Sequence, residues 1–345
     1  MDKLPLPVLV AGFTAAAALI WLAGYQLSRS TDAISDHFHL GEALGGLILL
    51  AVATNLPEMA IVGAAAIRHN FDIATGNILG GIAIQTVVLV LLDIATPVRH
   101  SLSDATRSLT QVLEGTVVVA VCAVVVMGTL LPKQAVVARI DPAALLIAVV
   151  WLGGLWLTKR AKDLPWASNR EEDQDSGGNK PQKAKSLATP VALAVFAGAA
   201  LVTLGAGVAV EITGNAIATD IHLNGVVFGG TILAAATALP EVSTGLAAVR
   251  MRDYELAVSD IFGGNAFLPV LFLPATILSG QSVLGAAQHT DVLLACLGIL
   301  LTTVYVVGML FRPKGQWLRM GPDSITVLAL YGLGVAALVA VSGGK

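Results

Sequence analysis

The chain alternates long apolar segments with short polar turns, and one long polar stretch divides it near the middle. About 20 apolar residues are enough to cross a bilayer as a helix. Residues 159–186 are rich in Lys, Asp, Glu, Gly and Asn and hold few side chains that a core could bury. The pattern predicts an all-α integral membrane protein with ten transmembrane helices in two groups of five. The predicted helices are 6–26, 42–67, 72–93, 109–131, 141–158, 188–212, 224–250, 255–279, 289–310 and 323–342.

Composition supports this class. The 345 residues are 56% hydrophobic and 12% charged, with a mean hydropathy of +0.80, whereas soluble domains carry about 25% charged residues. We therefore expect the lipid bilayer as the main partner, with no nucleic-acid partner and no resident cofactor. The domain organisation that we predict is a first repeat at 1–158, a linker at 159–187 and a second repeat at 188–345.

The positions of Lys and Arg predict the orientation, because cytoplasmic loops carry an excess of them. With the loops placed alternately on two sides, 15 of the 20 Lys and Arg residues fall on the side of the linker and 5 on the other. This division predicts a cytoplasmic linker and outer N- and C-termini, in what we expect to be a bacterial inner membrane.

The two halves share a sequence. Residues 39–90 align on 222–273 without a gap, 183 positions apart, and 18 of the 52 aligned positions are identical. Five is an odd number of helices, so the second copy enters the membrane with the opposite polarity. Inverted repeats of this kind are the plan of many secondary transporters, with the substrate site at their interface.

Each copy places a carboxylate directly behind a proline. Because proline lacks an N–H group, Pro57 leaves the Ala53 carbonyl without its helical partner, and Pro240 does the same to Ala236. Thr54 and Thr237 stand four residues before Glu58 and Glu241, on the same helix face. A glutamate at the centre of a membrane helix costs about 2.5–3.5 kcal/mol. Two of them at equivalent positions indicate an ion site rather than packing alone.

The ligand types predict which ions bind. Carboxylate, hydroxyl and carbonyl oxygens are hard ligands that suit Ca²⁺, and no His or Cys joins them to favour zinc or copper. The next helix adds a polar stripe of Asn77 and Gln85 in the first copy and Asp260 in the second, which is a candidate third acid. Asn265, one step off the stripe, is a weaker candidate. Three other acids near predicted helix ends are expected to contact water: Asp93, Glu114 and Glu211.

At these residues the chain resembles the Na⁺/Ca²⁺ exchanger branch of the Ca²⁺/cation antiporter superfamily. The family has two inverted repeats, each with a Thr-Ser-Leu-Pro-Glu-like phrase and then a Gly-Asn-x-x-Gly-Ser-Asn-like phrase. The first repeat here reads Thr-Asn-Leu-Pro-Glu at 54–58 and Gly-Asn-Ile-Leu-Gly-Gly at 76–81. The second reads Thr-Ala-Leu-Pro-Glu at 237–241 and Ser-Asp-Ile-Phe-Gly-Gly-Asn at 259–265.

The resemblance implies that Glu58, Glu241, Thr54 and Thr237 bind Ca²⁺. It carries over less well to Na⁺, because the serine positions of the family are occupied differently. They hold Asn55, Ala238, Gly81 and Gly264, and the polar position at the end of the stripe is Gln85 in one repeat and Leu268 in the other. Asn55 keeps a side-chain oxygen and stays a candidate ligand. The calcium ligands are thus retained, whereas the sodium ligands are depleted.

We expect a secondary antiporter that exchanges Ca²⁺, or a related divalent cation, for Na⁺ or H⁺. Two facing carboxylates in a low-dielectric site cannot both stay charged at little cost, so protons can replace the metal there. The alternatives are an exchanger coupled to H⁺ alone, a passive cation channel and a scaffold without transport. An intramembrane enzyme is disfavoured because the chain has no His-Glu-x-x-His motif and no Ser/His pair at corresponding depths.

Overall fold

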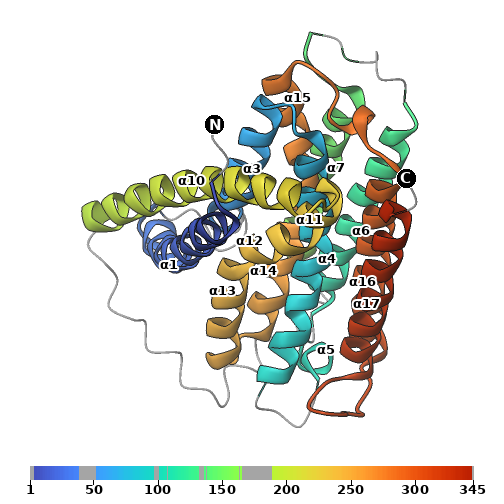
Figure 1. Cartoon of the computed structure of the whole chain (residues 1–345). Coiled ribbons are helices and arrows are strands. Elements are labelled where there is room, and N and C mark those ends of the chain that lie inside the picture. The colour runs from blue at the N-terminus through green and yellow to red at the C-terminus, as the bar shows by residue number, and fades with distance from the viewer. Residues whose placement is uncertain are drawn as a thin grey trace.

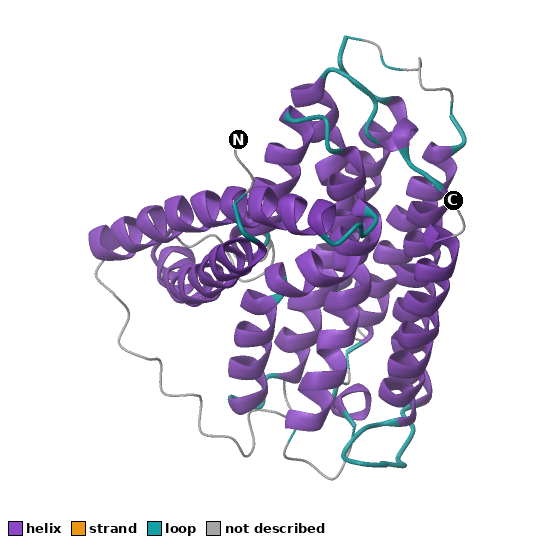
Figure 2. Cartoon of the chain, in the orientation of Figure 1, coloured by secondary structure: helices purple, strands orange, loops and turns teal. Residues whose placement is uncertain are grey.

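The computed structural model describes residues 4–38, 52–96, 101–106, 108–131, 136, 138–162, 164 and 189–343. Within these ranges the regular structure is helical and there is no β-strand (Figure 2). Eight of the described helices are long and apolar enough to cross a membrane, and a bent helix pair adds a ninth. The all-helical membrane architecture is therefore confirmed. The count of ten stays a prediction, because residues 42–51 of the second predicted helix lie outside the described ranges.

The first half holds six described helices and the second half holds a larger number of shorter pieces (Figure 1). In the first half the elements are α1 (Leu6–Phe38), α3 (Leu56–Ile67), α4 (Phe71–Ala95), α5 (Leu102–Ala105), α6 (Leu109–Thr129) and α7 (Pro142–Lys162). In the second half they are α10 (Thr189–Asp220), α11 (Gly225–Phe228), the π-helical turn η2 (Gly229–Leu233), α12 (Ala234–Thr237), α13 (Leu239–Arg250), α14 (Tyr254–Phe267), the 3₁₀ turn η3 (Leu268–Leu271), α15 (Phe272–Ser279), the 3₁₀ turn η4 (Leu284–Ala286), α16 (His289–Phe311) and α17 (Pro322–Gly343).

Three helices continue at least four residues past the end that the apolar pattern predicts. α1 continues to Phe38 instead of residue 26, α10 continues to Asp220 instead of 212, and α7 reaches Lys162 instead of 158. Hydropathy marks where a segment stops being apolar, but a helix ends only where its backbone hydrogen bonds stop. Polar residues such as those after Gln26 can therefore continue a helix beyond the apolar segment.

α4 is the central helix of the bundle. In its most apolar stretch of 18 residues, 72% is buried inside the protein. The same share for the segment from α14 to α15 is 67%. The corresponding share is 22% for α1, 28% for α10 and 17% for α17, so a larger part of these helices lies at the surface of the protein. α1 and α10 lie side by side and project from the main bundle on the left of Figure 1.

Helices α1 and α10 contact the two Pro-containing motifs, at 54–58 and 237–241, through equivalent glycines. A Cβ atom added at Gly24 of α1 would lie 2.7 Å from the Pro240 ring, and one at Gly207 of α10 would lie 3.0 Å from the Pro57 carbonyl oxygen. Gly24 and Gly207 are 183 positions apart, as are the two prolines. Each repeat therefore packs its first helix on the proline of the other repeat.

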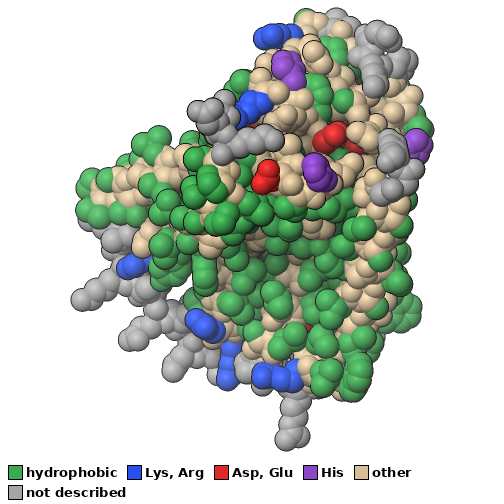
Figure 3. Space-filling model, viewed as in Figure 1, with side chains coloured by type: hydrophobic (Ala, Val, Ile, Leu, Met, Phe, Trp, Pro, Cys, Tyr) green, Lys and Arg blue, Asp and Glu red, His purple; other side chains and the backbone are tan. Residues whose placement is uncertain are grey.

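Basic side chains gather at one end of the bundle, which we call the Arg250 face (Figure 3). It is formed by the turns that join α13 to α14 and α16 to α17. The described basic residues of these turns are Arg250, Arg252, Arg312, Lys314 and Arg319. The opposite end, the Arg68 face, carries Arg68 after α3 and Arg139 before α7.

Candidate cation site

Both proline phrases interrupt their helices as the sequence predicts. Asn55 is a turn residue at which α3 begins, with Pro57 in its first turn, and Ala238 is the equivalent turn residue before α13. The segments before and after Ala238 are bent by 43°. A π-helical turn, η2, precedes this break by a few residues, and such turns are frequent at functional sites. The interruption brings the first turns of α3 and α13 to the centre of the bundle.

Glu58 and Glu241 meet there. Both side chains are fully buried, at 0% exposure. Gln85 of α4 lies between them and donates from Nε2 to Glu58 Oε1 at 3.4 Å and to Glu241 Oε1 at 3.5 Å. Glu58 Oε2, Glu241 Oε2 and Gln85 Oε1 are buried and have no hydrogen-bond partner among the described residues. The carboxylate pair and the amide that joins it thus leave three buried oxygen atoms, one from each of three helices, without a hydrogen-bond partner among the described residues.

The two predicted threonines lie with the carboxylates. Thr237 is fully buried and its side chain is beside the Glu58 carboxylate, so a residue of the second repeat contacts the glutamate of the first. Thr54 is 1% exposed, and its hydroxyl accepts from Asn55 Nδ2 at 3.5 Å. The site therefore combines charged and neutral oxygens, both of which are ligand types that Ca²⁺ uses in proteins.

Glycine at position 264 makes room for two amides. A Cβ atom there would lie 3.1 Å from Gln85 Oε1 and 3.2 Å from Asn55 Nδ2. The next residue, Asn265, is buried and donates from Nδ2 to Thr86 Oγ1 at 3.1 Å. Asn55 and Gln85 are thereby placed next to each other. Asn265 instead pairs with Thr86, a residue that the sequence analysis did not select although it directly follows Gln85.

Asp260 and Asn77 occupy different surroundings despite their equivalent positions. Asp260 accepts a hydrogen bond from the hydroxyl of Thr244, which lies one turn after Glu241 and was not selected from the sequence. Asp260 is also close enough to Glu241 for their charges to interact. Asn77 is fully buried, and its amide atoms have no hydrogen-bond partner among the described residues.

No group of three or more His, Cys, Asp or Glu side chains with metal-binding geometry occurs in the described part of the chain. Asp260 and the two glutamates therefore do not form a three-carboxylate centre. A cation between Glu58 and Glu241 would take its remaining ligands from hydroxyl, amide and backbone oxygens, which are suitable ligands for Ca²⁺.

The three acids expected to contact water are instead buried. Asp93 accepts from Leu102 N, Gly321 N and the Ser324 hydroxyl at 2.6–2.7 Å, which ties α4 to α5 and α17. Glu211 accepts from Asn70 at 3.1 Å and pairs with Arg68 at 3.6 Å. Glu114 accepts from Ser259 at 2.7 Å. The expectation was wrong because neighbouring helices cover these helix ends.

Comparison with known proteins identifies the family. The profile of the sodium/calcium exchanger protein family matches residues 8–158 and 191–340. The chain belongs to the sodium/calcium exchanger family. Among its curated relatives are the inner membrane protein YrbG of Escherichia coli (28% identical, covering 76% of this chain and 78% of that protein) and the putative antiporter CaxA of Alkalimonas amylolytica (24%, covering 78% and 80%).

Solved structures show the same fold in other exchangers. The H⁺/Ca²⁺ exchanger CAX superposes with a TM-score of 0.67 at 12% identity, covering 97% of this chain and 86% of that chain. The sodium–calcium exchanger NCX_Mj superposes with a TM-score of 0.61 at 17% identity, covering 96% and 99%. The exchanger fold is thus shared with proteins described as using either H⁺ or Na⁺.

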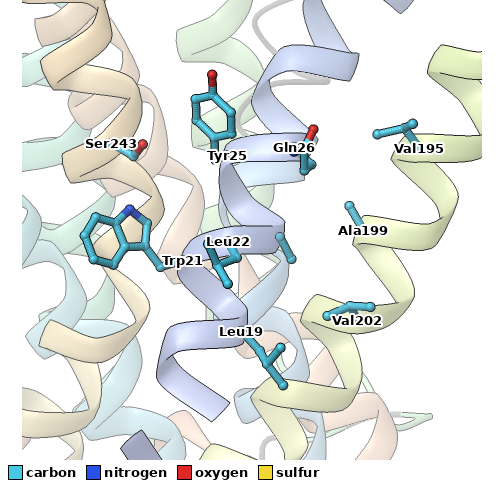
Figure 4. A pocket seen from close by; sticks show the side chains of 10 residues that line it. Leu19, Trp21, Leu22, Tyr25, Gln26, Val195, Ala199, Val202 and Ser243 are labelled. Carbon is cyan, nitrogen blue, oxygen red and sulfur yellow. The ribbon is translucent and has the colours of Figure 1, made fainter. Parts of the chain in front are cut away.

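In this exchanger-family protein, a groove separates α1 from α10 beside the site. Its volume is about 600 Å³. Leu19 and Gln26 of α1 lie on the side toward Ala199 and Val202 of α10, and Trp21 lies on the side toward α13 (Figure 4). Ser243 of α13, two residues after Glu241, also lines the groove. The lining is mostly apolar and contains none of the predicted cation ligands.

We predict that Gln85→Leu weakens cation binding without unfolding the protein. The substitution gives the first repeat the residue that the second repeat has at Leu268. It removes Gln85 Oε1, an unpartnered amide oxygen next to the carboxylates that is a candidate cation ligand, and a contact with a charged group, taken as equal to a charged hydrogen bond, contributes about 1.5–3 kcal/mol. The KM for Ca²⁺ in a vesicle flux assay should rise roughly 10- to 100-fold by that estimate. An unchanged KM would mean that Gln85 is only a packing residue.

Proposed function

We propose that this protein is a secondary antiporter that exchanges Ca²⁺, or a related divalent cation, for Na⁺ or H⁺. The observation that carries the proposal is the pair Glu58 and Glu241. The two carboxylates come from equivalent positions of two related halves, are fully buried, and are joined through one amide. Membership of the exchanger family supports it independently.

Exchange follows from competition for the same oxygens. Two negative charges in a low-dielectric environment require a compensating positive charge, which one divalent cation or two monovalent ions can supply. The metal must therefore leave before the counter-ions bind, and the counter-ions must leave before the metal binds again. The helix interruptions at Asn55 and Ala238 add backbone carbonyls whose helical partners the prolines remove.

Both counter-ions have support from the residues. Protons need only the carboxylates, and Gly81, Gly264 and Ala238 supply no side-chain oxygen for Na⁺. Sodium is supported by Asn265, whose Oδ1 is buried without a hydrogen-bond partner among the described residues, because a neutral amide oxygen is a suitable sodium ligand. We keep both ions in the proposal and let the experiment below separate them.

The proposed topology has ten helices in two inverted repeats, with a site near the midplane. We place the Arg250 face and the 159–187 linker in the cytoplasm and both termini outside, in the inner membrane of a bacterium. The excess of Lys and Arg on one side supports this orientation. The reciprocal contacts of Gly24 with Pro240 and of Gly207 with Pro57 support the inverted repeat.

The direct test is gradient-driven flux. Purified protein is reconstituted into liposomes loaded with ⁴⁵Ca²⁺, and efflux is followed against an imposed Na⁺ gradient, an imposed pH gradient or neither. We expect efflux with at least one gradient and little without. Efflux that follows Na⁺ identifies a sodium-coupled exchanger, and efflux that follows only pH identifies a proton-coupled one.

Two results would contradict the proposal. Flux that persists at the same rate without any counter-ion would identify a passive channel. No flux with Ca²⁺, Mn²⁺ or Mg²⁺ under either gradient, from protein that is monodisperse in detergent, would reject divalent-cation antiport.

A further inference from the structure

A second group of buried oxygens lies between the Arg250 face and the central site. Glu114 and Gln111 stand three residues apart on one side of α6, and both side chains are at least nine-tenths buried, with 9% and 4% exposure. Ser259 of α14 donates to Glu114 Oε2 at 2.7 Å and accepts from Gln111 Nε2 at 3.0 Å. Gln111 Oε1 is buried and has no hydrogen-bond partner in the described part of the chain.

This group connects to the central site through Asp260. Ser259 and Asp260 are adjacent in α14, Asp260 accepts from Thr244, and Thr244 is three residues after Glu241. Asp260 lies close enough to Glu241 for their charges to interact. Polar side chains thus occur at successive positions between α6 and Glu241, with Ser259 and Asp260 adjacent along α14 and the Thr244 hydroxyl also donating to the Glu241 backbone carbonyl at 3.2 Å.

The acids lie at increasing depth from the Arg250 face. With a rise of about 1.5 Å per residue, Glu114 is about 7.5 Å from the start of α6 and Asp260 about 9 Å from the start of α14. By the same measure Glu241 is about 13.5 Å from the end of α13. The hydrogen bond between Ser259 and Glu114 shows that α6 and α14 are in register at this depth.

The corresponding approach from the Arg68 face is built differently. The positions equivalent to Glu114 and Asp260, 183 residues away, are Leu297 and Asn77, and Gly76 replaces Ser259. Acids at these two positions therefore occur on one approach only, whereas the Arg68 approach has the buried Asp291 of α16 beside Asp72 of α4, in the first turns of their helices. Packing alone does not require a carboxylate in α6 at a position where α16 uses leucine.

We propose that Glu114, with Gln111, Ser259 and Asp260, forms a capture site for divalent cations that enter from the Arg250 face. The inference rests on the proposed antiport function and adds a binding step to it. Carboxylate, amide and hydroxyl oxygens are the ligands that a hard divalent cation prefers. A partly desolvated negative group at the entrance raises the local concentration of cations and so increases the rate at which they reach Glu241.

The test is the sidedness of the KM for Ca²⁺. Exchange is measured in everted and right-side-out membrane vesicles, so that Ca²⁺ is offered to one face at a time. Glu114→Gln, which keeps an acceptor for Ser259, should raise the KM roughly tenfold when Ca²⁺ is offered at the Arg250 face. The KM at the Arg68 face and kcat should stay within about twofold of the parent protein, which a general structural defect would not allow.

Asp253→Asn is the matched control. Asp253 is an exposed acid at the same face, and asparagine also serves as a helix N-cap, so only a surface charge is lost. Its KM should stay within twofold on both faces. If Glu114→Gln does not fold, Ser259→Ala replaces it, and a smaller rise of KM confined to the Arg250 face is expected.

Two outcomes would overturn the capture site. One is a KM for Glu114→Gln that equals that of Asp253→Asn, and the other is a KM that rises equally on both faces. Because the parent protein is measured in the same vesicles, its failure to exchange Ca²⁺ would reject the proposed function instead. If the parent protein exchanges Ca²⁺ and Glu114→Gln has an unchanged KM, the capture site alone would be rejected.

Discussion

Replacing Glu58 or Glu241 by glutamine is expected to abolish cation exchange while leaving the protein folded. Each substitution preserves side-chain shape and the hydrogen-bond acceptor for Gln85 but removes one of the two charges that we propose hold the cation. Unit charges 4 Å apart interact by about 4 kcal/mol at an effective dielectric constant of about 20. Since about 1.4 kcal/mol is a tenfold change in affinity, exchange should fall by more than roughly 100-fold in either variant.

The matched control for these variants is Glu255→Gln. Glu255 lies in the first turn of α14, partly exposed at the Arg250 face and away from the Glu58–Glu241 pair. Its exchange rate should remain near that of the parent protein. Exchange that survives in both Glu58→Gln and Glu241→Gln would show that the cations travel elsewhere in the protein.

Gly80→Ala is expected to destabilise the protein severely, although alanine usually favours a helix. A Cβ atom at position 80 would lie only 2.1 Å from the Cα atom of Gly230 and 2.4 Å from its carbonyl oxygen. These are backbone atoms of η2, so no rotamer change can relieve the clash and α4 must move away. Overpacking of a core costs about 1–3 kcal/mol, and a backbone clash belongs at the upper end or beyond. The melting temperature in detergent should fall by several degrees, and less protein should elute as a monodisperse peak.

Gly332→Ala provides the comparison for this prediction. Gly332 lies in α17 on an exposed face, where an added Cβ would have no atom within 4 Å. Alanine there should leave the melting temperature unchanged or raise it slightly, because helix propensity favours alanine over glycine. Equal melting temperatures for the two variants would mean that α4 and η2 do not approach as closely as described.

Sequence was sufficient to predict the features that depend on one helix at a time. The prolines at 57 and 240 and the missing N–H group predict the helix interruptions, because this effect needs no tertiary information. The gapless duplication then predicts that Glu58 and Glu241 are equivalent, and the apolar run around each glutamate predicts its burial. These features were found in the described structure.

Features that depend on the rotation and packing of neighbouring helices could not be derived in the same way. Gln85 was predicted as one member of a stripe, but its position between both carboxylates requires α4 to lie between α3 and α13. The same limit applies to Asp260, whose partner Thr244 is on a different helix, and to Thr86, which pairs with Asn265.

Burial of acids near helix ends was mispredicted for a related reason. Distance from the end of an apolar segment was taken as a measure of contact with water, although Glu114 is covered by α14 and Glu211 is hydrogen-bonded to the turn between α3 and α4. Whether a helix end is open to water depends on what packs over it. No single-segment pattern carries that information.

Equilibrium binding of Ca²⁺ tests the central claim most directly. Purified protein in detergent is dialysed against ⁴⁵Ca²⁺ with and without excess Na⁺ and at high and low pH, beside Glu58→Gln, Glu241→Gln and Glu255→Gln. We predict that the parent protein and Glu255→Gln bind Ca²⁺ at a high-affinity site from which Na⁺ or protons displace it, and that the other two variants lose this site and keep at most weaker binding at Glu114. High-affinity, displaceable binding that persists in Glu58→Gln and Glu241→Gln with the dissociation constant of the parent would contradict the assignment of the cation site to this pair.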